Sequence, residues 1–281
     1  MAARRGNPGG AAVRLAVVLG LALLLGGCGT LLPEPGDGPG RVIDNPAAIP
    51  DAVPRDVPHS RYGNPDEYEV FGQRYRVMES ADGFRERGIA SWYGSKFHGR
   101  RTSSGEPYDM YAMTAAHKHL PLPTWVAVRH LGNNREIVVK VNDRGPFAAN
   151  RIIDLSYAAA AKLGMLDTGT APVEIQVVTP EAPAPSRSPR VASTPSSAAP
   201  GYWIQMAAFD AVDNARRLAD RLVASAISAA PAIHQGDDGL HRVRLGPLPD
   251  IAAVDRLSDE LQRANFEPGH VIIPPDAPTF D

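Results

Sequence analysis

Two proline-rich stretches constrain the fold of this chain more than any other feature. The first, from Gly29 to about Pro65, carries eight prolines and few apolar residues, and the second, from Thr179 to Pro200, carries six with Ser and Ala between them. Such segments bury too little apolar surface to offset the entropy of ordering, and proline keeps them extended. The sequence therefore predicts separately folded units joined by a linker.

The N-terminal residues are typical of an exported bacterial lipoprotein. Arg4 and Arg5 give a positive start, and residues 15–25 are almost wholly apolar, which suits a signal-peptide core but is too short to span a bilayer. The run ends in LGGC, which resembles a lipobox whose cysteine thiol is lipidated. We expect a signal peptide over residues 1–27, lipidation at Cys28 and a membrane tether over residues 28–66. The alternative is an ordinary signal peptide with an incidental cysteine.

Cysteine content and charge exclude several classes of function. Cys28 is the only cysteine, so the mature chain can form no internal disulfide and has no thiolate nucleophile or cysteine-based metal site. The net charge is −2 at pH 7, so no overall charge imbalance recruits nucleic acid. We expect no nucleic-acid partner, no metal and no cofactor.

Residues 67–178 are predicted to form a mainly β unit. YEVFGQRYRVM suits a hairpin through Gly72, and short β-branched or aromatic segments follow, each bounded by Gly, Asn, Asp or Pro. They are GIASWYG, WVAVRHL, EIVVKVND and PVEIQVV. One helix interrupts them, with Ser156 as its N-cap and Gly164 at its end. Many short strands with one short helix indicate a small closed barrel.

Residues 201–273 are predicted to form a small α+β unit. GYWIQMAAF, APAIHQ, LHRVRLGPL and GHVII read as strands, and DAVDNARRLADRLVAS and DIAAVDRLSDELQRAN as amphipathic helices. The order βαββαβ is that of a ferredoxin-like fold. Residues 179–200 remain as a disordered linker and residues 274–281 as a tail.

The segment 90–110 combines aromatic and acidic side chains in a glycine-bearing loop. The aromatic residues could belong to a core or could stack on a sugar, and one of the carboxylates could simply hold the loop. The aromatic members are Trp92, Tyr93 and Phe97, and the acidic members are Glu106 and Asp109.

A second cluster lies where a predicted strand ends at Asp143, next to Arg144 and a Gly-Pro turn. Asp143 could be a turn carboxylate that bonds its own backbone. Asp154 is interpreted as a structural group near the helix start, where negative charge is favourable. His117 and His119 could ligate a metal, but they lack HExxH spacing, and packing or hydrogen bonding is the commoner role.

These segments carry a family resemblance. GIASWYGSKFHGRRTSSGEPYDM, MTAAHKHLPLPT, VKVNDRGPF and RIIDLS follow one another within residues 88–178. In this order they resemble the double-psi β-barrel of the rare lipoprotein A family, the septal ring lytic transglycosylases. YWIQMAAF and HRVRLGPL resemble the sporulation-related repeat (SPOR) domain, which in that family binds glycan strands stripped of their peptides.

The resemblance implies cleavage of peptidoglycan without water. An enzyme carboxyl protonates the glycosidic oxygen and later takes a proton back, a second group stabilises the oxocarbenium-like transition state, and the C6 hydroxyl of muramic acid forms a 1,6-anhydro end. Matching positions imply Asp143 as general acid/base, Glu106 as second carboxylate and His117 as a polar partner, with Asp109 a weaker candidate. The implied substrate contacts are Trp92, Tyr93, Phe97, Arg144 and Gln205.

The resemblance also implies a place in the cell. We expect an outer-membrane lipoprotein that faces the periplasm, since Gly29 rather than Asp follows Cys28, with a role in daughter-cell separation beside division-site proteins. The main alternative is a non-catalytic peptidoglycan-binding lipoprotein with an expansin-like barrel, because a fold does not establish an activity. A metal-dependent hydrolase is a more distant alternative.

Overall fold

The computed structural model describes residues 38–180 and 201–273. The predicted signal peptide, Cys28, most of the linker and the tail lie outside the described residues. Within the described ranges, no helix has the length and apolar character needed to cross a bilayer.

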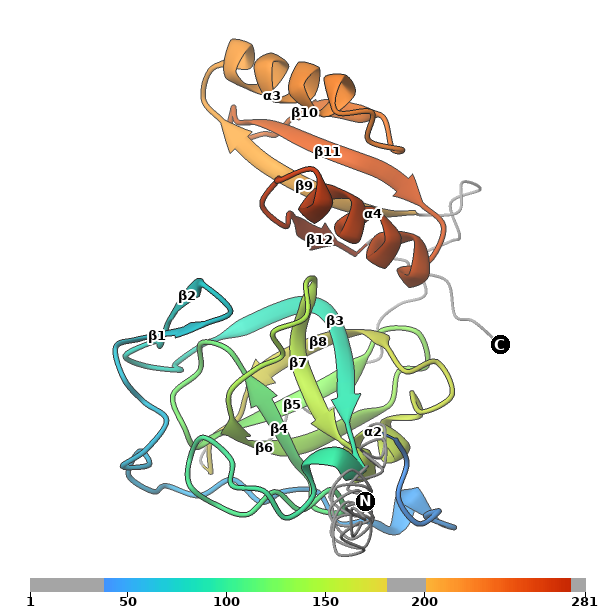
Figure 1. Cartoon of the computed structure of the whole chain (residues 1–281). Helices are drawn as coiled ribbons and strands as arrows, with labels where there is room; N and C mark the ends of the chain where they lie inside the picture. The colour runs from blue at the N-terminus through green and yellow to red at the C-terminus, as the bar shows by residue number, and fades with distance from the viewer. Residues whose placement is uncertain (1–37, 181–200, 274–281) are drawn as a thin grey trace, which may run out of the picture. The chain divides into compact units, whose positions relative to one another are not determined.

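The first unit contains a closed six-stranded β-barrel (Figure 1). Around the barrel the strand order is β3-β7-β4-β6-β5-β8, with β3–β7 and β4–β6 parallel and the other pairs antiparallel. Alternate apolar residues of these strands fill the interior, as expected for a small barrel. The predicted mainly β barrel is thereby confirmed. Its strands are β3 (Arg85–Tyr93), β4 (Thr114–His117), β5 (Thr124–His130), β6 (Glu136–Asp143), β7 (Arg151–Ser156) and β8 (Ala171–Val177).

Short elements around the barrel follow the local sequence signals. Helix α2 (Tyr157–Leu163) begins at Ser156, whose side chain accepts a hydrogen bond from the Ala159 N–H, and ends at Gly164 with φ of 79°. Both caps agree with the prediction. Ser156 supplies a side-chain acceptor for a free backbone N–H, and Gly164 adopts the left-handed conformation that commonly ends a helix. The predicted hairpin is formed by an antiparallel pair of strands. The remaining short elements are β1 (Glu67–Val70), β2 (Gln73–Arg76), η1 (Pro46–Ala48) and η2 (Ser95–Phe97).

Residues 38–66, here called the N-terminal strap, belong to the barrel unit. The Ala52 N–H donates to the Val138 carbonyl at 3.0 Å, and Lys162 donates to the Asp51 carboxylate at 2.7 Å. The sequence predicts that this unit begins at residue 67, whereas in the structure these contacts already tie residues 51 and 52 to it. A polar, proline-rich segment can join a fold when its backbone groups find partners in the neighbouring strands, without burying much apolar surface of its own.

The C-terminal unit has the predicted βαββαβ order. Its four strands form an antiparallel sheet in the order β10-β11-β9-β12, and apolar side chains from both helices pack with the sheet in one core. The Asp250 carboxylate caps the second helix by accepting from the Ala253 N–H at 2.7 Å. The elements are β9 (Tyr202–Phe209), α3 (Val212–Ala224), β10 (Pro231–Gln235), β11 (His241–Leu248), α4 (Ile251–Arg263) and β12 (His270–Ile272).

Candidate active site

Two aspartates from different strands flank the same residue of β4. Ala116 is paired with Asp143 of β6 on one side and with Asp154 of β7 on the other. Because neighbouring strands lie about 4.8 Å apart, the two aspartate backbones are separated by roughly 10 Å, across a residue with the smallest side chain. The sequence indicates for Asp154 only a structural role near the helix start and does not reveal this juxtaposition.

The phenol of Tyr93 is affected by the charge of both aspartates. Burial raises the pKa of this phenol well above its ordinary value, and the nearby Tyr108, Asp143 and Asp154 raise it further. Both carboxylates therefore lie close enough to Tyr93 to act on its charge. Asp154 could have been found from the strand pattern, since it alternates with the core residues Ile153 and Leu155 and so faces away from the barrel interior.

A β-bulge in β6 sets the direction of Asp143. Ala115 is paired with Val141 and the next residue, Ala116, with Asp143, so the pairing skips Asn142. A bulge of this kind re-aims side chains and is common beside active sites. Here it lets Asn142 and Asp143 be contacted by the same loop, residues 102–106.

The carboxylate of Asp143 is fixed through one of its oxygens. Oδ1 accepts from the Ser103 N–H at 2.8 Å, from Ser103 Oγ at 2.7 Å and from the Arg144 N–H at 2.8 Å. All hydrogen bonds of the Asp143 carboxylate within the described residues go to Oδ1, so Oδ2 is the oxygen left without such a bond. Ser103 was not among the predicted site residues, although it lies three residues before Glu106 in the loop that was singled out.

Glu106 is held by the same loop and by β6. Lys140 Nζ lies 2.5 Å from Oε1, and Asn142 Nδ2 donates to Oε2 at 2.9 Å. Burial acts to raise the pKa of this carboxyl, but the hydrogen bonds from Asn142 and Lys140 outweigh it and keep the pKa below the ordinary value. Glu106 is therefore ionised at neutral pH, which suits stabilisation of positive charge better than donation of a proton.

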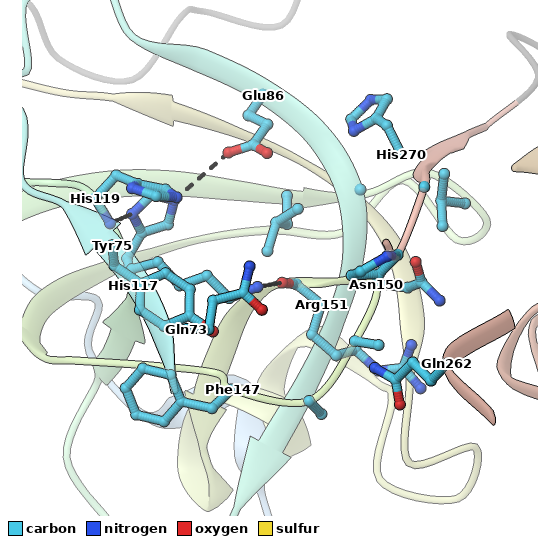
Figure 2. Close-up of a pocket in the computed structure, with 18 residues that line it drawn as sticks. Gln73, Tyr75, Glu86, His117, His119, Phe147, Asn150, Arg151, Gln262 and His270 are labelled. Atoms are coloured by element: carbon cyan, nitrogen blue, oxygen red, sulfur yellow. Dashed lines mark hydrogen bonds and ion pairs between the residues drawn. The ribbon is translucent and has the colours of Figure 1, made fainter. Parts of the chain in front are cut away.

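The imidazole of His117 contacts a carboxylate that the sequence analysis did not consider. The side chain is 1% exposed. Its Nδ1 accepts from the N–H groups of His119 at 3.1 Å and Leu120 at 3.0 Å, and its Nε2 lies 3.5 Å from Glu86 Oε2 (Figure 2). Burial lowers the pKa of His117, and Glu86 only partly opposes this. The polar partner of His117 is thus Glu86 rather than Asp143 or Glu106.

Two of the predicted aromatic contacts are placed by packing. Tyr93 is 7% exposed and stacks on Tyr108 with 4.1 Å between ring centroids, which favours the alternative that it belongs to a core over a role in stacking on a sugar. Trp92 is partly buried against Tyr157, with 5.8 Å between centroids. Phe97 is 39% exposed and is the most exposed of the three.

Arg144 was predicted to bind substrate, but its guanidinium is engaged by the protein. Nε donates to the Gly63 carbonyl at 2.9 Å, Nη1 to the carbonyls of His117 and Leu120, and Nη2 to Asn64 Oδ1 at 3.0 Å. Because every guanidinium nitrogen has such a partner, Arg144 clamps the strap to the turn after β4. Arg144 therefore supports the backbone next to Asp143 and has no guanidinium nitrogen without a protein partner.

The remaining predicted residues lie apart from these contacts. Asp109 accepts from the Tyr111 N–H at 2.9 Å and so holds its own loop. In the C-terminal unit Gln205 accepts from Arg244 Nε at 3.1 Å. Trp203 shares its sheet face, opposite the buried Ile204, and meets His234 edge-on at 5.4 Å. Trp203 was missed, although an aromatic residue two positions before Gln205 in a strand must share its face.

The described residues contain no group of three or more His, Cys, Asp or Glu side chains arranged to hold a metal ion.

Comparison with known proteins agrees with this architecture. Residues 85–175 match a family model described as lytic transglycolase, and residues 198–274 match the SPOR domain. Fold and site thus define a lytic transglycosylase-type double-psi β-barrel joined to a SPOR domain.

Relatives along most of the chain identify the family. The chain is 40% identical to the endolytic peptidoglycan transglycosylase RlpA of Vibrio cholerae, over 90% of this chain and 95% of that protein. It is 38% identical to RlpA of Pseudomonas aeruginosa strain UCBPP-PA14, over 78% and 79% of the respective chains. The protein belongs to the RlpA family of endolytic peptidoglycan transglycosylases. The crystal structure of the RlpA SPOR domain from Pseudomonas aeruginosa is 31% identical over 26% of this chain and 100% of that chain, with a TM-score of 0.24.

Proposed function

We propose that this protein cleaves peptidoglycan glycan strands by lytic transglycosylation at the outer face of β4. The observation that carries the proposal is the placement of Asp143 and Asp154 on either side of Ala116, with Glu106 held beside β6. An endolytic reaction needs a carboxyl that can move a proton and negative charge near the forming cation. The site supplies both from rigid strands and one short loop.

Asp143 is the proposed general acid/base. Its Oδ2 delivers a proton to the glycosidic oxygen between muramic acid and glucosamine, and the bond from that oxygen to the anomeric carbon of muramic acid breaks. The C6 hydroxyl of the same muramic acid bonds to its own anomeric carbon and returns its proton to Asp143. Glu106, ionised beside Lys140, and Asp154 across β4 stabilise the positive charge that develops on the sugar ring.

The test is single-turnover cleavage of peptide-free glycan strands, with mass analysis of the ends produced. We expect 1,6-anhydro-muramic ends from the wild type, and a loss of about 10² to 10⁴ in rate in Asp143→Asn, as for removal of a general acid. Glu106→Gln and Asp154→Asn should also lose most of the rate while glycan binding stays within several-fold, since these swaps are nearly isosteric.

A matched control is Asp44→Asn, which alters an exposed carboxylate of the strap and should cleave at the wild-type rate. Reducing ends in place of anhydro ends would mean ordinary hydrolysis. Full activity in Asp143→Asn would overturn the assignment of the acid/base. Glycan retention without any cleavage by the wild type would favour the alternative of a non-catalytic binding protein.

We further propose that the SPOR unit selects peptide-free strands through the sheet face that carries Trp203 and Gln205. An aromatic ring beside amide and guanidinium groups can stack on a sugar and bond its hydroxyls. Trp203→Ala should weaken retention on peptide-free sacculi while leaving cleavage of short soluble strands unchanged. Equal retention by the variant and the wild type would count against this face.

The remaining proposals concern the place of the protein in the cell. Lipidation of Cys28 would tether it to the outer membrane facing the periplasm, and the SPOR unit would enrich it at the septum, beside division-site proteins, for daughter-cell separation. Cys28→Ser should move the protein out of the membrane fraction, and removal of residues 201–281 should abolish septal enrichment. Retention of the Cys28→Ser variant in the outer membrane would contradict the anchor.

A further inference from the structure

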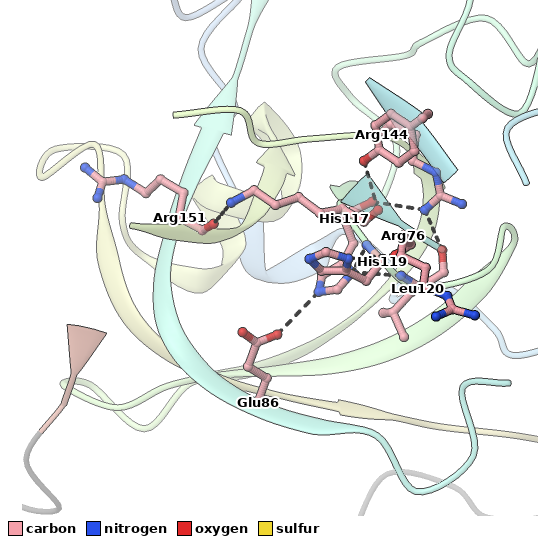
Figure 3. Close-up of polar contacts among 9 residues, drawn as sticks. Arg76, Glu86, His117, His119, Leu120, Arg144 and Arg151 are labelled. Atoms are coloured by element: carbon pink, nitrogen blue, oxygen red, sulfur yellow. Dashed lines mark hydrogen bonds and ion pairs between the residues drawn. The ribbon is translucent and has the colours of Figure 1, made fainter. Parts of the chain in front are cut away.

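A continuous set of polar contacts runs from Glu86 to Asp143, and Figure 3 shows its part from Glu86 to Arg144. It begins on β3, where the Glu86 carboxylate points at the ring of His117. It crosses the turn of residues 117–120 and the guanidinium of Arg144. It ends at Asp143, whose Oδ1 accepts from the Arg144 N–H at 2.8 Å. The roles proposed above use only the last member of this set.

The first step fixes the imidazole of His117. Since Nδ1 accepts from the N–H groups of His119 and Leu120, it cannot carry the ring proton in the neutral form, and the proton lies on Nε2. Nε2 is the atom that faces Glu86 Oε2 at 3.5 Å. A fully buried N–H needs an acceptor, and Glu86 supplies it from the neighbouring strand. Glu86 and the two backbone groups thus set both the tautomer and the direction of the ring.

The second step fixes the turn. Nδ1 of His117 accepts hydrogen bonds from the two N–H groups of the turn. The carbonyls of His117 and Leu120 face Arg144. Phe84 packs edge-on against the imidazole, with 5.4 Å between centroids. If the imidazole rotated or shifted, both N–H groups would lose their acceptor. The carbonyls that accept hydrogen bonds from the Arg144 guanidinium would then move.

The third step reaches the reacting carboxylate. Arg144 follows Asp143 directly, and its side chain is held on the turn while its N–H holds Asp143 Oδ1. A shift of the turn therefore pulls on the backbone that orients Asp143. Displacements of about 1 Å away from the chemistry can cost 10²-fold in rate, so a residue that never touches the glycan can control cleavage through this path.

We propose that Glu86 is a positioning residue for glycan cleavage, which acts on Asp143 through His117, the turn of residues 117–120 and Arg144. The proposal rests on the assignment of Asp143 as the acid/base. It also gives His117 a role that its burial permits, since an imidazole sealed from solvent holds the turn without meeting the substrate.

The test compares Glu86→Ala, Glu86→Gln and Glu86→Asp in the full-length protein by steady-state cleavage of peptide-free glycan strands. Glu86→Ala should lower kcat about tenfold or more with KM within twofold, because a misaligned acid is lost from the transition state and not from binding. Glu86→Gln should recover at least half of kcat, since its amide oxygen can accept the Nε2 proton. Glu86→Asp, whose carboxylate is one methylene further from the ring, should lie between them.

A second readout follows the ring itself. The ¹⁵N signals of the His117 imidazole should report the Nε2-protonated tautomer in the wild type and in Glu86→Gln, with the Nε2 proton protected from exchange. In Glu86→Ala this proton should exchange faster. The matched control is Glu136→Ala, which removes an exposed carboxylate at the start of β6 and should leave both readouts unchanged.

The outcomes separate this proposal from the proposed function. If the wild type produces no anhydro ends, the proposed function fails. If the wild type cleaves and Glu86→Ala keeps full kcat well below its melting temperature, Glu86 is a stabilising residue only and this proposal is overturned. Equal loss of kcat in Glu86→Gln and Glu86→Ala would also overturn it, because the acceptor would then have no effect. Should Glu86→Ala fold poorly, Glu86→Asp carries the same comparison.

Discussion

Nη2 of Arg144 donates a hydrogen bond to Oδ1 of Asn64 at 3.0 Å, across 80 positions of sequence. Asn64 lies in the N-terminal strap and is also tied to the turn before β5, since its Nδ2 donates to the Leu122 carbonyl at 2.8 Å and the Leu122 N–H donates to its Oδ1 at 2.7 Å. The strap thus supports the residue that follows Asp143. A segment expected to serve as a tether is part of the scaffold of the site.

Asn64→Ala should destabilise the barrel unit and slow cleavage. The substitution leaves partly buried groups of Leu122 and Arg144 without their partner, at about 1–3 kcal/mol for each unsatisfied group. Thermal unfolding monitored by tryptophan fluorescence, together with kcat on glycan strands, checks both effects. Asn45→Ala is the matched control, because Asn45 is exposed in the same strap and caps nothing with its side chain. An Asn64→Ala variant as stable as Asn45→Ala would contradict this role.

Ser103→Ala should reduce kcat while leaving the fold intact. It removes the Oγ donor to Asp143 Oδ1 and the Oγ acceptor of the Arg144 N–H. A hydrogen bond to a charged group is worth about 1.5–3 kcal/mol, which corresponds to a loss of tenfold or more when it positions the reacting carboxylate. Steady-state kinetics on peptide-free strands measure this, with the exposed Ser95→Ala as the control. Unchanged kcat in Ser103→Ala would mean that the backbone N–H groups alone fix Asp143.

Glu174→Gln should destabilise the barrel more than the loss of an exposed ion pair does. Glu174 is 5% exposed and accepts hydrogen bonds from Arg85, Arg87 and Arg129 on the two flanking strands. Without its charge the guanidiniums repel one another, and we expect a loss of about 1–3 kcal/mol, below the full cost of breaking a buried pair because the arginines are partly solvated.

Glu67→Gln is the matched control for Glu174→Gln. Its partner Arg74 lies 3.8 Å away, and both side chains are largely exposed, so the change should be within about 0.5 kcal/mol. Denaturant unfolding of the two variants beside the wild type decides the comparison. Equal stability of Glu174→Gln and Glu67→Gln would contradict this prediction, because the three arginines would then turn toward solvent without a cost in stability.

The stability of the barrel should fall on mild acidification because of His117. Burial lowers the pKa of this imidazole below its ordinary value of 6.5, with Glu86 opposing in part. The unfolded chain therefore takes up a proton at higher pH than the folded one, so stability is full above about pH 6.5 and declines below it, by at most about 1.4 kcal/mol per pH unit. Melting temperatures between pH 5 and pH 8 test this. His117→Gln should flatten the profile, whereas His59→Gln, an exposed substitution in the strap, should leave it unchanged.

The local sequence determined most of the secondary structure and singled out two of the carboxylates that we propose for the site. Ser156 and Gly164 define both ends of α2 because a cap needs only its neighbours in sequence, and the apolar periods of the C-terminal unit predict its βαββαβ order for the same reason. Glu106 and Asp143 could be selected from polar, glycine-bearing segments that interrupt strands.

The tertiary structure decided which of these residues lie together. Asp154 joins Asp143 only because β7 and β6 both pair with β4, and pairing between strands distant in sequence leaves no local pattern. Tyr93 and Arg144 have side chains suited to a sugar, but stacking on Tyr108 and the carbonyls of the 117–120 turn occupy them. The strap holds to the barrel through backbone hydrogen bonds, which almost any residue can make. Its composition therefore predicted a tether, and only the positions of its partners in space made it part of the site.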